Sequence, residues 1–298
     1  MAVVCDTHLN GEPSRRELLV TTGLLAAAAA TAAAIAHGAP RAEADPVPPT
    51  VLPVTVLPVT VLPVTVLPAT VFPATVFPVQ VRPDLFVMPR DAWGADLPPK
   101  AGIEPEAVQF LLVHHTASSN TYPSGGARAV LRATYAFHTS AAKGWPDVCY
   151  EFFIDHDGVI YEGRAGALAG PVRADATGGS QGFAQLVCLV GDFTQTDPTG
   201  AMTDSLVKVL AWLADRYGID TSPGATTAFV SRGSQRWRAG TVVTTPTIAG
   251  HRDMSYTTCP GDHVYAGLQG GLREAVHAQR QAWLGATYRA ERLGPTNP

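Results

Sequence analysis

Charged residues and cysteines are both scarce in this chain of 298 residues, and each scarcity excludes a class of protein. Aspartate, glutamate, lysine and arginine make up 15% of the sequence, and the formal net charge is −4. A small negative charge argues against a surface built to bind nucleic acid or another polyanion. The four cysteines, Cys5, Cys149, Cys188 and Cys259, are too few for a disulfide framework.

The first 44 residues have the layout of an export signal. The pair Arg15-Arg16 precedes an Ala-rich apolar run over residues 18–36, and the small-residue pattern Ala42-Glu43-Ala44 follows. This segment resembles a twin-arginine signal peptide, which implies cleavage before Asp45 and export of the folded protein. An uncleaved membrane anchor is the alternative, because the run approaches the length that spans a bilayer. Its alanines and threonines and the cleavage pattern favour removal, which would leave no membrane span.

Residues 45–83 are a low-complexity segment in which proline recurs at every fifth position from 53 to 83. Each proline removes a backbone donor and biases its predecessor toward extended geometry, so neither a helix nor a central strand can run through the segment. The pattern predicts an extended, semi-rigid spacer. Attachment to a component of the cell envelope is an alternative for so apolar a linker, and a plain spacer is favoured.

Residues 84–285 are expected to form one α/β domain with a mixed central β-sheet flanked by helices, followed by a tail over residues 286–298. The apolar runs at residues 108–113 and 183–190 predict buried strands. Residues 222–247 show little periodicity and are assigned to a loop, with room for a short hairpin. The remaining expected elements are strands at 148–154 and 159–163, and helices at 127–138, from a cap at Thr203 to about 217, and at 262–282.

Histidine and cysteine side chains predict a metal site. His251 and Cys259 lie eight positions apart in a loop rich in turn-forming residues, and the pair His114-His115 ends a predicted buried strand. Side chains alternate between the two faces of a strand, so only one of these two histidines can reach a shared metal. Two imidazoles and one thiolate would leave the fourth position of a zinc ion open to water.

Five ordered segments resemble motifs of one family: 113–116, 144–147, 150–152, 160–164 and 250–262. They read Val-His-His-Thr, Gly-Trp-Pro-Asp, Tyr-Glu-Phe, Ile-Tyr-Glu-Gly-Arg and Gly-His-Arg-Asp through Cys-Pro-Gly-Asp. These motifs are typical of the type 2 N-acetylmuramoyl-L-alanine amidases and the peptidoglycan recognition proteins, and the resemblance covers roughly residues 84–285.

The resemblance implies roles for five residues. It makes His114, His251 and Cys259 the ligands of a Zn²⁺ ion, Tyr150 the catalytic tyrosine, and Thr257 a residue that orients the reacting groups. The implied reaction is zinc-dependent hydrolysis of the amide bond between N-acetylmuramic acid and L-alanine, with peptidoglycan or muropeptides as the binding partner.

The chain departs from the family pattern around the expected substrate groove. In the loop at residues 170–179, Asp175 stands where many members carry a histidine, so Arg173, Asp175 and Trp145 are the candidate groove residues. Arg164 could bind substrate or close a salt bridge. Glu151 occupies a position where asparagine is frequent, and Asp192 likewise replaces an asparagine.

Three functions remain open from the sequence: a zinc amidase of peptidoglycan, a non-catalytic peptidoglycan-binding module, and a zinc peptidase or amidase acting on another amide. Members of the family without activity generally lack the cysteine ligand, so Cys259 favours the first. Cys149 and Cys188 form either one disulfide or two separate buried thiols, and the second alternative is favoured because cysteine behaves as a small hydrophobic residue.

Overall fold

The computed structural model describes residues 76–178 and 182–293. The expected export signal and residues 45–75 of the proline-rich segment lie outside these residues. Within the described part of the chain, no helix combines the length and the apolar character that a membrane span requires.

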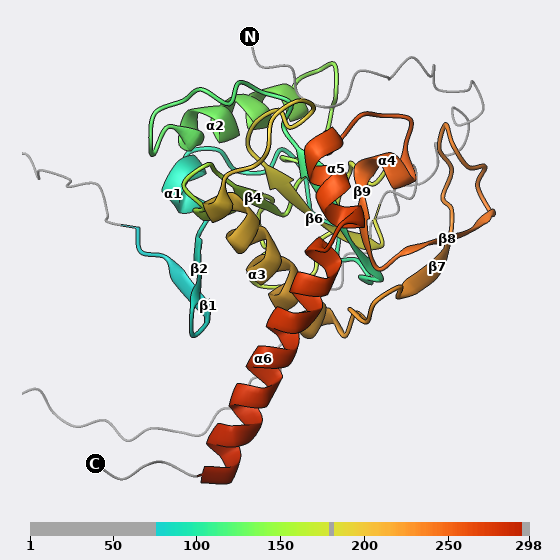
Figure 1. Cartoon of the computed structure of the whole chain (residues 1–298). Helices are drawn as coiled ribbons and strands as arrows, with labels where there is room; N and C mark the ends of the chain where they lie inside the picture. The colour runs from blue at the N-terminus through green and yellow to red at the C-terminus, as the bar shows by residue number, and fades with distance from the viewer. Residues whose placement is uncertain (1–75, 179–181, 294–298) are drawn as a thin grey trace, which may run out of the picture. The chain divides into compact units, whose positions relative to one another are not determined.

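A seven-stranded mixed sheet forms the centre of the domain (Figure 1). Its strand order is β1-β2-β5-β4-β6-β3-β9. Strands β4, β6, β3 and β9 run parallel, whereas β1 pairs with β2 and β4 pairs with β5 in the antiparallel sense. The strands are β1 (Val79–Arg82), β2 (Leu85–Met88), β3 (Phe110–His115), β4 (Phe152–Ile154), β5 (Ile160–Glu162), β6 (Ala184–Leu189) and β9 (Ile248–Gly250).

Helices cover both faces of this sheet, which confirms the expected mixed sheet flanked by helices. One core cluster joins α1 and α2 to one face, and the other joins α3, α5 and α6 to the opposite face. A short helix, α4, directly follows β9. The helices are α1 (Asp91–Gly94), α2 (Ala127–His138), α3 (Gly200–Tyr217), α4 (His251–Met254), α5 (Asp262–Gln269) and α6 (Leu272–Leu293).

Strand β3 contributes to both core clusters because its side chains alternate. Leu111 and Val113 pack in the cluster that contains α3, whereas Leu112 packs in the cluster that contains α2. The same alternation directs His114 toward the α2 face and His115 toward the α3 face. The two histidines therefore lie on opposite faces, as the sequence predicts.

Several helices begin or end at residues other than those expected from the sequence. The helix expected over residues 262–282 is interrupted at Gly270 and Gly271, and Gly271 has a φ of 126° that glycine tolerates best. Its second half, α6, continues past residue 285. Helix α3 begins after Thr199, whose side chain accepts a hydrogen bond from the backbone N–H of Met202, so the cap lies four residues before Thr203.

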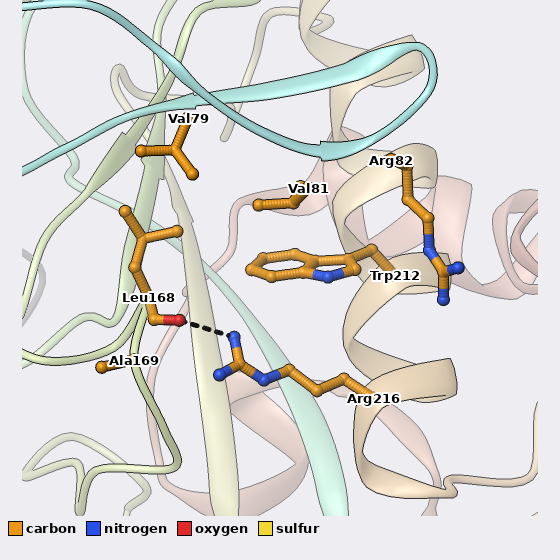
Figure 2. A pocket seen from close by; sticks show the side chains of 7 residues that line it. All are labelled: Val79, Val81, Arg82, Leu168, Ala169, Trp212 and Arg216. Carbon is orange, nitrogen blue, oxygen red and sulfur yellow. Dashed lines mark hydrogen bonds between the residues drawn. The ribbon is translucent and has the colours of Figure 1, made fainter.

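Residues 79–82, assigned to the spacer, form strand β1. This strand lies at the edge of the sheet and is flanked by Pro78 and Pro83, an arrangement that leaves the central strands free of proline. The sheet therefore begins before the expected boundary at residue 84. A pocket of about 580 Å³ lies beside β1. In Figure 2, the ring of Trp212 on α3 lies between Val81 and Arg216. None of the residues lining this pocket belongs to the predicted metal site.

The segment at residues 222–247 contains a hairpin of β7 (Thr226–Val230) and β8 (Val242–Pro246). Its anchor is Phe229, which is buried and stacks on Phe110 at 5.4 Å and on Phe183 at 5.6 Å between ring centroids. Phe229 of β7, together with the buried Val243 of β8, therefore packs the hairpin onto the domain.

Removing this anchor should loosen the hairpin. We expect Phe229→Ala to lower the free energy of unfolding by about 3 kcal/mol, because a buried ring is replaced by a cavity, and to speed amide exchange in β7 and β8. Phe86→Ala is the control: Phe86 is 49% exposed, so its loss should change stability by less than about 0.5 kcal/mol. Equal effects in urea unfolding of the two variants would contradict this assignment.

Candidate metal centre

Strand pairing brings two histidines together. In the parallel pair of β3 and β9, Val113 lies opposite Gly250, so the residues that follow, His114 and His251, come side by side. Their rings lie 4.3 Å apart between centroids. Cys259, in the loop before α5, completes a cluster in which all three side chains are buried.

The geometry of the cluster fits a zinc ion. One ligand atom from each of His114, His251 and Cys259 lies within 4.8 Å of the others. The Sγ of Cys259 lies 3.6 Å from the Nδ1 of His114. A tetrahedral site with usual Zn–N and Zn–S bond lengths has a nitrogen–sulfur separation of about 3.6 Å. The residues therefore present a compatible donor set with three protein ligands.

Electrostatics also suit metal binding. Burial, followed by the charges of His251, His115 and His138, holds the pKa of His114 well below its usual value. His114 is therefore neutral at physiological pH, the form that binds metals. The backbone N–H of His115 donates to the Sγ of Cys259 at 3.4 Å, a contact that favours the thiolate.

The loop that carries the ligands is held by its own polar residues. The carboxylate of Asp253 accepts hydrogen bonds from the N–H of Gly250 at 2.8 Å and from the hydroxyl of Tyr265 at 2.6 Å. Arg252 forms an ion pair with Asp262 at 2.8 Å. The hydroxyl of Thr257 accepts a hydrogen bond from the backbone N–H of Cys259 at 3.2 Å. Thr257 therefore shapes the turn at a ligand, in addition to any role toward substrate.

Tyr150 lies directly against the metal cluster. Its ring is buried and lies 5.1 Å from that of His114 and 5.6 Å from that of His138 between centroids. Gly163 faces the backbone of Tyr150, and a Cβ at Gly163 would lie only 2.4 Å from the Tyr150 carbonyl oxygen. The glycine of the Glu-Gly-Arg motif is thus required for the close approach that places Tyr150.

Arg164 lines a polar cavity on the Tyr150 side of the site. Its side chain is 1% exposed and forms an ion pair with Asp175. Within the described residues, its Nε and Nη1 have no hydrogen-bond partner. The backbone N–H of Arg164 donates to the carbonyl of Tyr150 at 2.8 Å, which connects this cavity to the metal cluster. The cavity measures about 250 Å³ and is lined by Gly102, Ile103, Glu104, Pro146, Arg164, Arg173 and Asp175.

The structure thus brings Arg173 and Asp175 together at this cavity. Trp145 is not among its lining residues but immediately precedes Pro146, which is. The Trp145 ring packs edge-on against His138, with centroids 4.9 Å apart. Arg164 does close a salt bridge, one of the two roles that the sequence left open.

Three buried residues beside the site, Glu151, Cys149 and Cys188, were not assigned catalytic or binding roles from the sequence. Glu151 is buried, its carboxylate accepts a hydrogen bond from the N–H of Leu186 at 2.7 Å, and burial raises its pKa to about 8. The only signal for Glu151 in the sequence was a glutamate where asparagine is frequent.

Cys149 and Cys188 are buried as separate thiols, and the Cys149 Sγ lies 3.8 Å from His138 Nε2. The two-thiol alternative is therefore confirmed.

The buried carboxyl of Glu151 predicts a pH dependence of stability. The unfolded chain loses this proton above about pH 4.5, whereas the folded chain keeps it until about pH 8. The free energy of unfolding should therefore fall across this interval, by up to ~1.4 kcal/mol per pH unit. Glu151→Gln should abolish this component in urea unfolding of the chelator-treated protein.

The matched control for this measurement is Glu104→Gln, at an exposed position, which should keep the pH dependence of the parent chain. If Glu151→Gln and the parent chain lost stability in parallel between pH 5 and 8, Glu151 would not be the proton-binding group.

Comparisons with known proteins agree with this site. A family model described as N-acetylmuramoyl-L-alanine amidase matches residues 104–262. The peptidoglycan-recognition protein SC1a/b of Drosophila simulans is 28% identical over 163 residues, which are 55% of this chain and 73% of that protein. The N-acetylmuramoyl-L-alanine amidase of Homo sapiens is 32% identical over 186 residues, which are 60% of this chain and 27% of that protein. The chain thus spans less than a third of the human protein.

Two solved structures are similar to this chain. The match to Drosophila PGRP-LB covers 62% of this chain and 92% of PGRP-LB, with a TM-score of 0.48 and 23% sequence identity. The N-acetylmuramoyl-L-alanine amidase LysC from Clostridium intestinale has a TM-score of 0.43 and 18% identity, over 61% of this chain and 97% of its own. Because the family model extends over more than half of the sequence and includes His114, His251 and Cys259, the chain belongs to the N-acetylmuramoyl-L-alanine amidase family.

Proposed function

We propose that this protein is a zinc-dependent amidase that hydrolyses the bond between N-acetylmuramic acid and L-alanine in peptidoglycan. The observation that carries the proposal is the buried cluster of His114, His251 and Cys259 with Tyr150 packed against it. When bound, a zinc ion supplies a Lewis acid and lowers the pKa of a coordinated water to near neutrality.

The residues of the chain supply positioning and hydrogen bonds. Three protein ligands leave one position of a tetrahedral site for a reactant, as in catalytic rather than structural zinc sites. We assign Tyr150 to donate a hydrogen bond to the oxygen that gains negative charge as the amide is attacked. A donor held rigidly by His114, His138 and Phe153 needs no reorganisation during the reaction.

The cavity beside Arg164 suits the peptide part of such a substrate. Its buried guanidinium has N–H donors that are not satisfied within the described residues, and Arg173 adds a second cation. Stem peptides carry carboxylates, which guanidinium groups bind well. The backbone hydrogen bond from Arg164 to Tyr150 links this cavity to the residue packed against the ligand cluster, which supports binding of the peptide on the Tyr150 side.

A non-catalytic recognition protein is the second candidate, because several relatives are named peptidoglycan recognition proteins. The complete ligand set, including Cys259, favours catalysis. Hydrolysis of a different amide, such as a bond within the stem, is the third. Incubating the zinc-loaded full chain with purified muropeptides separates them: release of intact stems supports the amidase, binding without release the recognition protein, and cleavage inside the stem the peptidase.

The metal ligands make a direct prediction. Cys259→Ala should lose bound zinc, measured by atomic emission of the purified protein, and with it stem release. Cys188→Ala is the matched control, because Cys188 is also a buried thiol but lies outside the cluster, so it should keep one zinc per chain. An active Cys259→Ala protein without metal would refute the proposal.

Tyr150→Phe tests the assigned hydrogen bond. The ring and its contacts remain, so zinc content and KM should change little, whereas kcat should fall about 10²–10³-fold, the usual cost of one lost oxyanion donor. Steady-state kinetics on a defined muropeptide would show this. An unchanged kcat would mean that the Tyr150 hydroxyl takes no part in the reaction.

A further inference from the structure

Arg236, Trp237 and Tyr256 connect the tip of the β7–β8 hairpin to the loop that carries His251 and Cys259. The guanidinium of Arg236 lies 4.8 Å from the ring centroid of Trp237 and 5.9 Å from that of Tyr256. Its Nη1 donates to the carbonyls of Arg252 at 2.6 Å and of Asp253 at 3.0 Å. These carbonyls belong to α4, between two metal-site residues, His251 and Cys259. These contacts join the hairpin tip to the loop that carries His251 and Cys259, and we call the joined segment with Arg236, Trp237 and Tyr256 the rim.

The rim is preformed. Arg232, at the start of the tip, forms an ion pair with Glu106 at 2.7 Å and lies over the Phe183 ring at 4.0 Å. Phe229, described above, anchors the strand that leads into the tip. A rim fixed at its base and at its tip can bind a ligand with little loss of conformational entropy.

Tyr256 is the exposed element of this rim. Its side chain is 64% exposed although it lies only three positions before Cys259. An aromatic ring that stays open to solvent beside a reactive centre offers a flat apolar face, and its hydroxyl and the neighbouring guanidinium offer hydrogen bonds. A pyranose ring has the matching chemistry: an apolar face of C–H groups, edged by hydroxyl and acetamido groups.

The order of strands indicates which part of a substrate would reach Tyr256. Along β5-β4-β6-β3-β9, Arg164 follows β5, whereas Tyr256 follows β9 in the loop beyond α4. The strands that precede these two residues thus lie on opposite sides of β3, the strand that carries His114. The amide that we propose is cleaved carries peptide on one side and sugar on the other. With the peptide at Arg164, the sugar is directed toward Tyr256.

We propose that Tyr256, supported by Arg236 and Trp237, forms a subsite for the N-acetylhexosamine rings of the glycan strand. This inference rests on the proposed amidase function for the direction of the substrate. It adds a residue that selects substrates carrying sugar over peptides that lack it, and it predicts that affinity grows when the glycan is present.

Calorimetric titration of the full chain with the disaccharide N-acetylglucosaminyl-N-acetylmuramic acid, without peptide, tests the subsite. Tyr256→Ala should raise the Kd for the disaccharide about tenfold, as expected for the loss of one stacked ring. Tyr256→Phe, which keeps the ring, should stay within about twofold. Val242→Ala is the control, because Val242 is a similarly exposed apolar residue on the β7–β8 hairpin outside the proposed subsite, and it should bind like the parent chain. The free stem peptide should bind all four proteins equally.

The outcomes are decisive in both directions. No binding of the disaccharide by the parent chain, or equal binding by Tyr256→Ala, overturns the subsite. Loss of stem-peptide binding in Tyr256→Ala also overturns it, because the ring would then serve the peptide. Because binding is measured without hydrolysis, a chain that binds the disaccharide through Tyr256 but releases no stem would refute the amidase and leave the subsite standing.

Discussion

The parallel pairing of β3 with β9 brings together groups that lie far apart in the sequence, and the metal cluster depends on it. The register that sets Val113 opposite Gly250 makes His114 and His251 neighbours. It also brings Cys259 next to His114, 145 positions away. Moving this register by one residue would turn one histidine to the other face of the sheet. The core on both faces of β3 holds the register in place, so packing far from the cluster maintains its geometry.

Much of this site could be predicted from the sequence because its signals are local. The strand run ending at His114, the eight-residue spacing of His251 and Cys259, and the motif around Tyr150 are each readable in a short window. A short window of sequence does not reveal three other features: the ion pair of Arg164 with Asp175, the buried carboxyl of Glu151, and the hydrogen bond from Arg236 to α4. They arise where loops meet across the fold, and no periodic pattern encodes such meetings.

The same distinction explains the element boundaries. Gly270 and Gly271 interrupt an apolar pattern that would otherwise support one helix over residues 262–282, since backbone conformation there outweighs periodicity. Strand β1 shows the converse. A proline at every fifth position excludes a central strand, yet four residues between two prolines suffice for an edge strand, where unpaired donors face outward. Both outcomes follow from where backbone hydrogen bonds must be made.

His114 lies far from His251 and Cys259 in the sequence, so metal binding and folding of the domain would be coupled. Cys259 lies beyond β9, the last strand within the described residues, and reaches back to His114 on β3. A metal ion bound there would close a loop of more than a hundred residues, and its binding free energy would add to that of folding. A chain truncated just before residue 259 would keep every strand of the described sheet but could not complete the ligand set, so metal binding would require the segment beyond the sheet as well as the sheet itself.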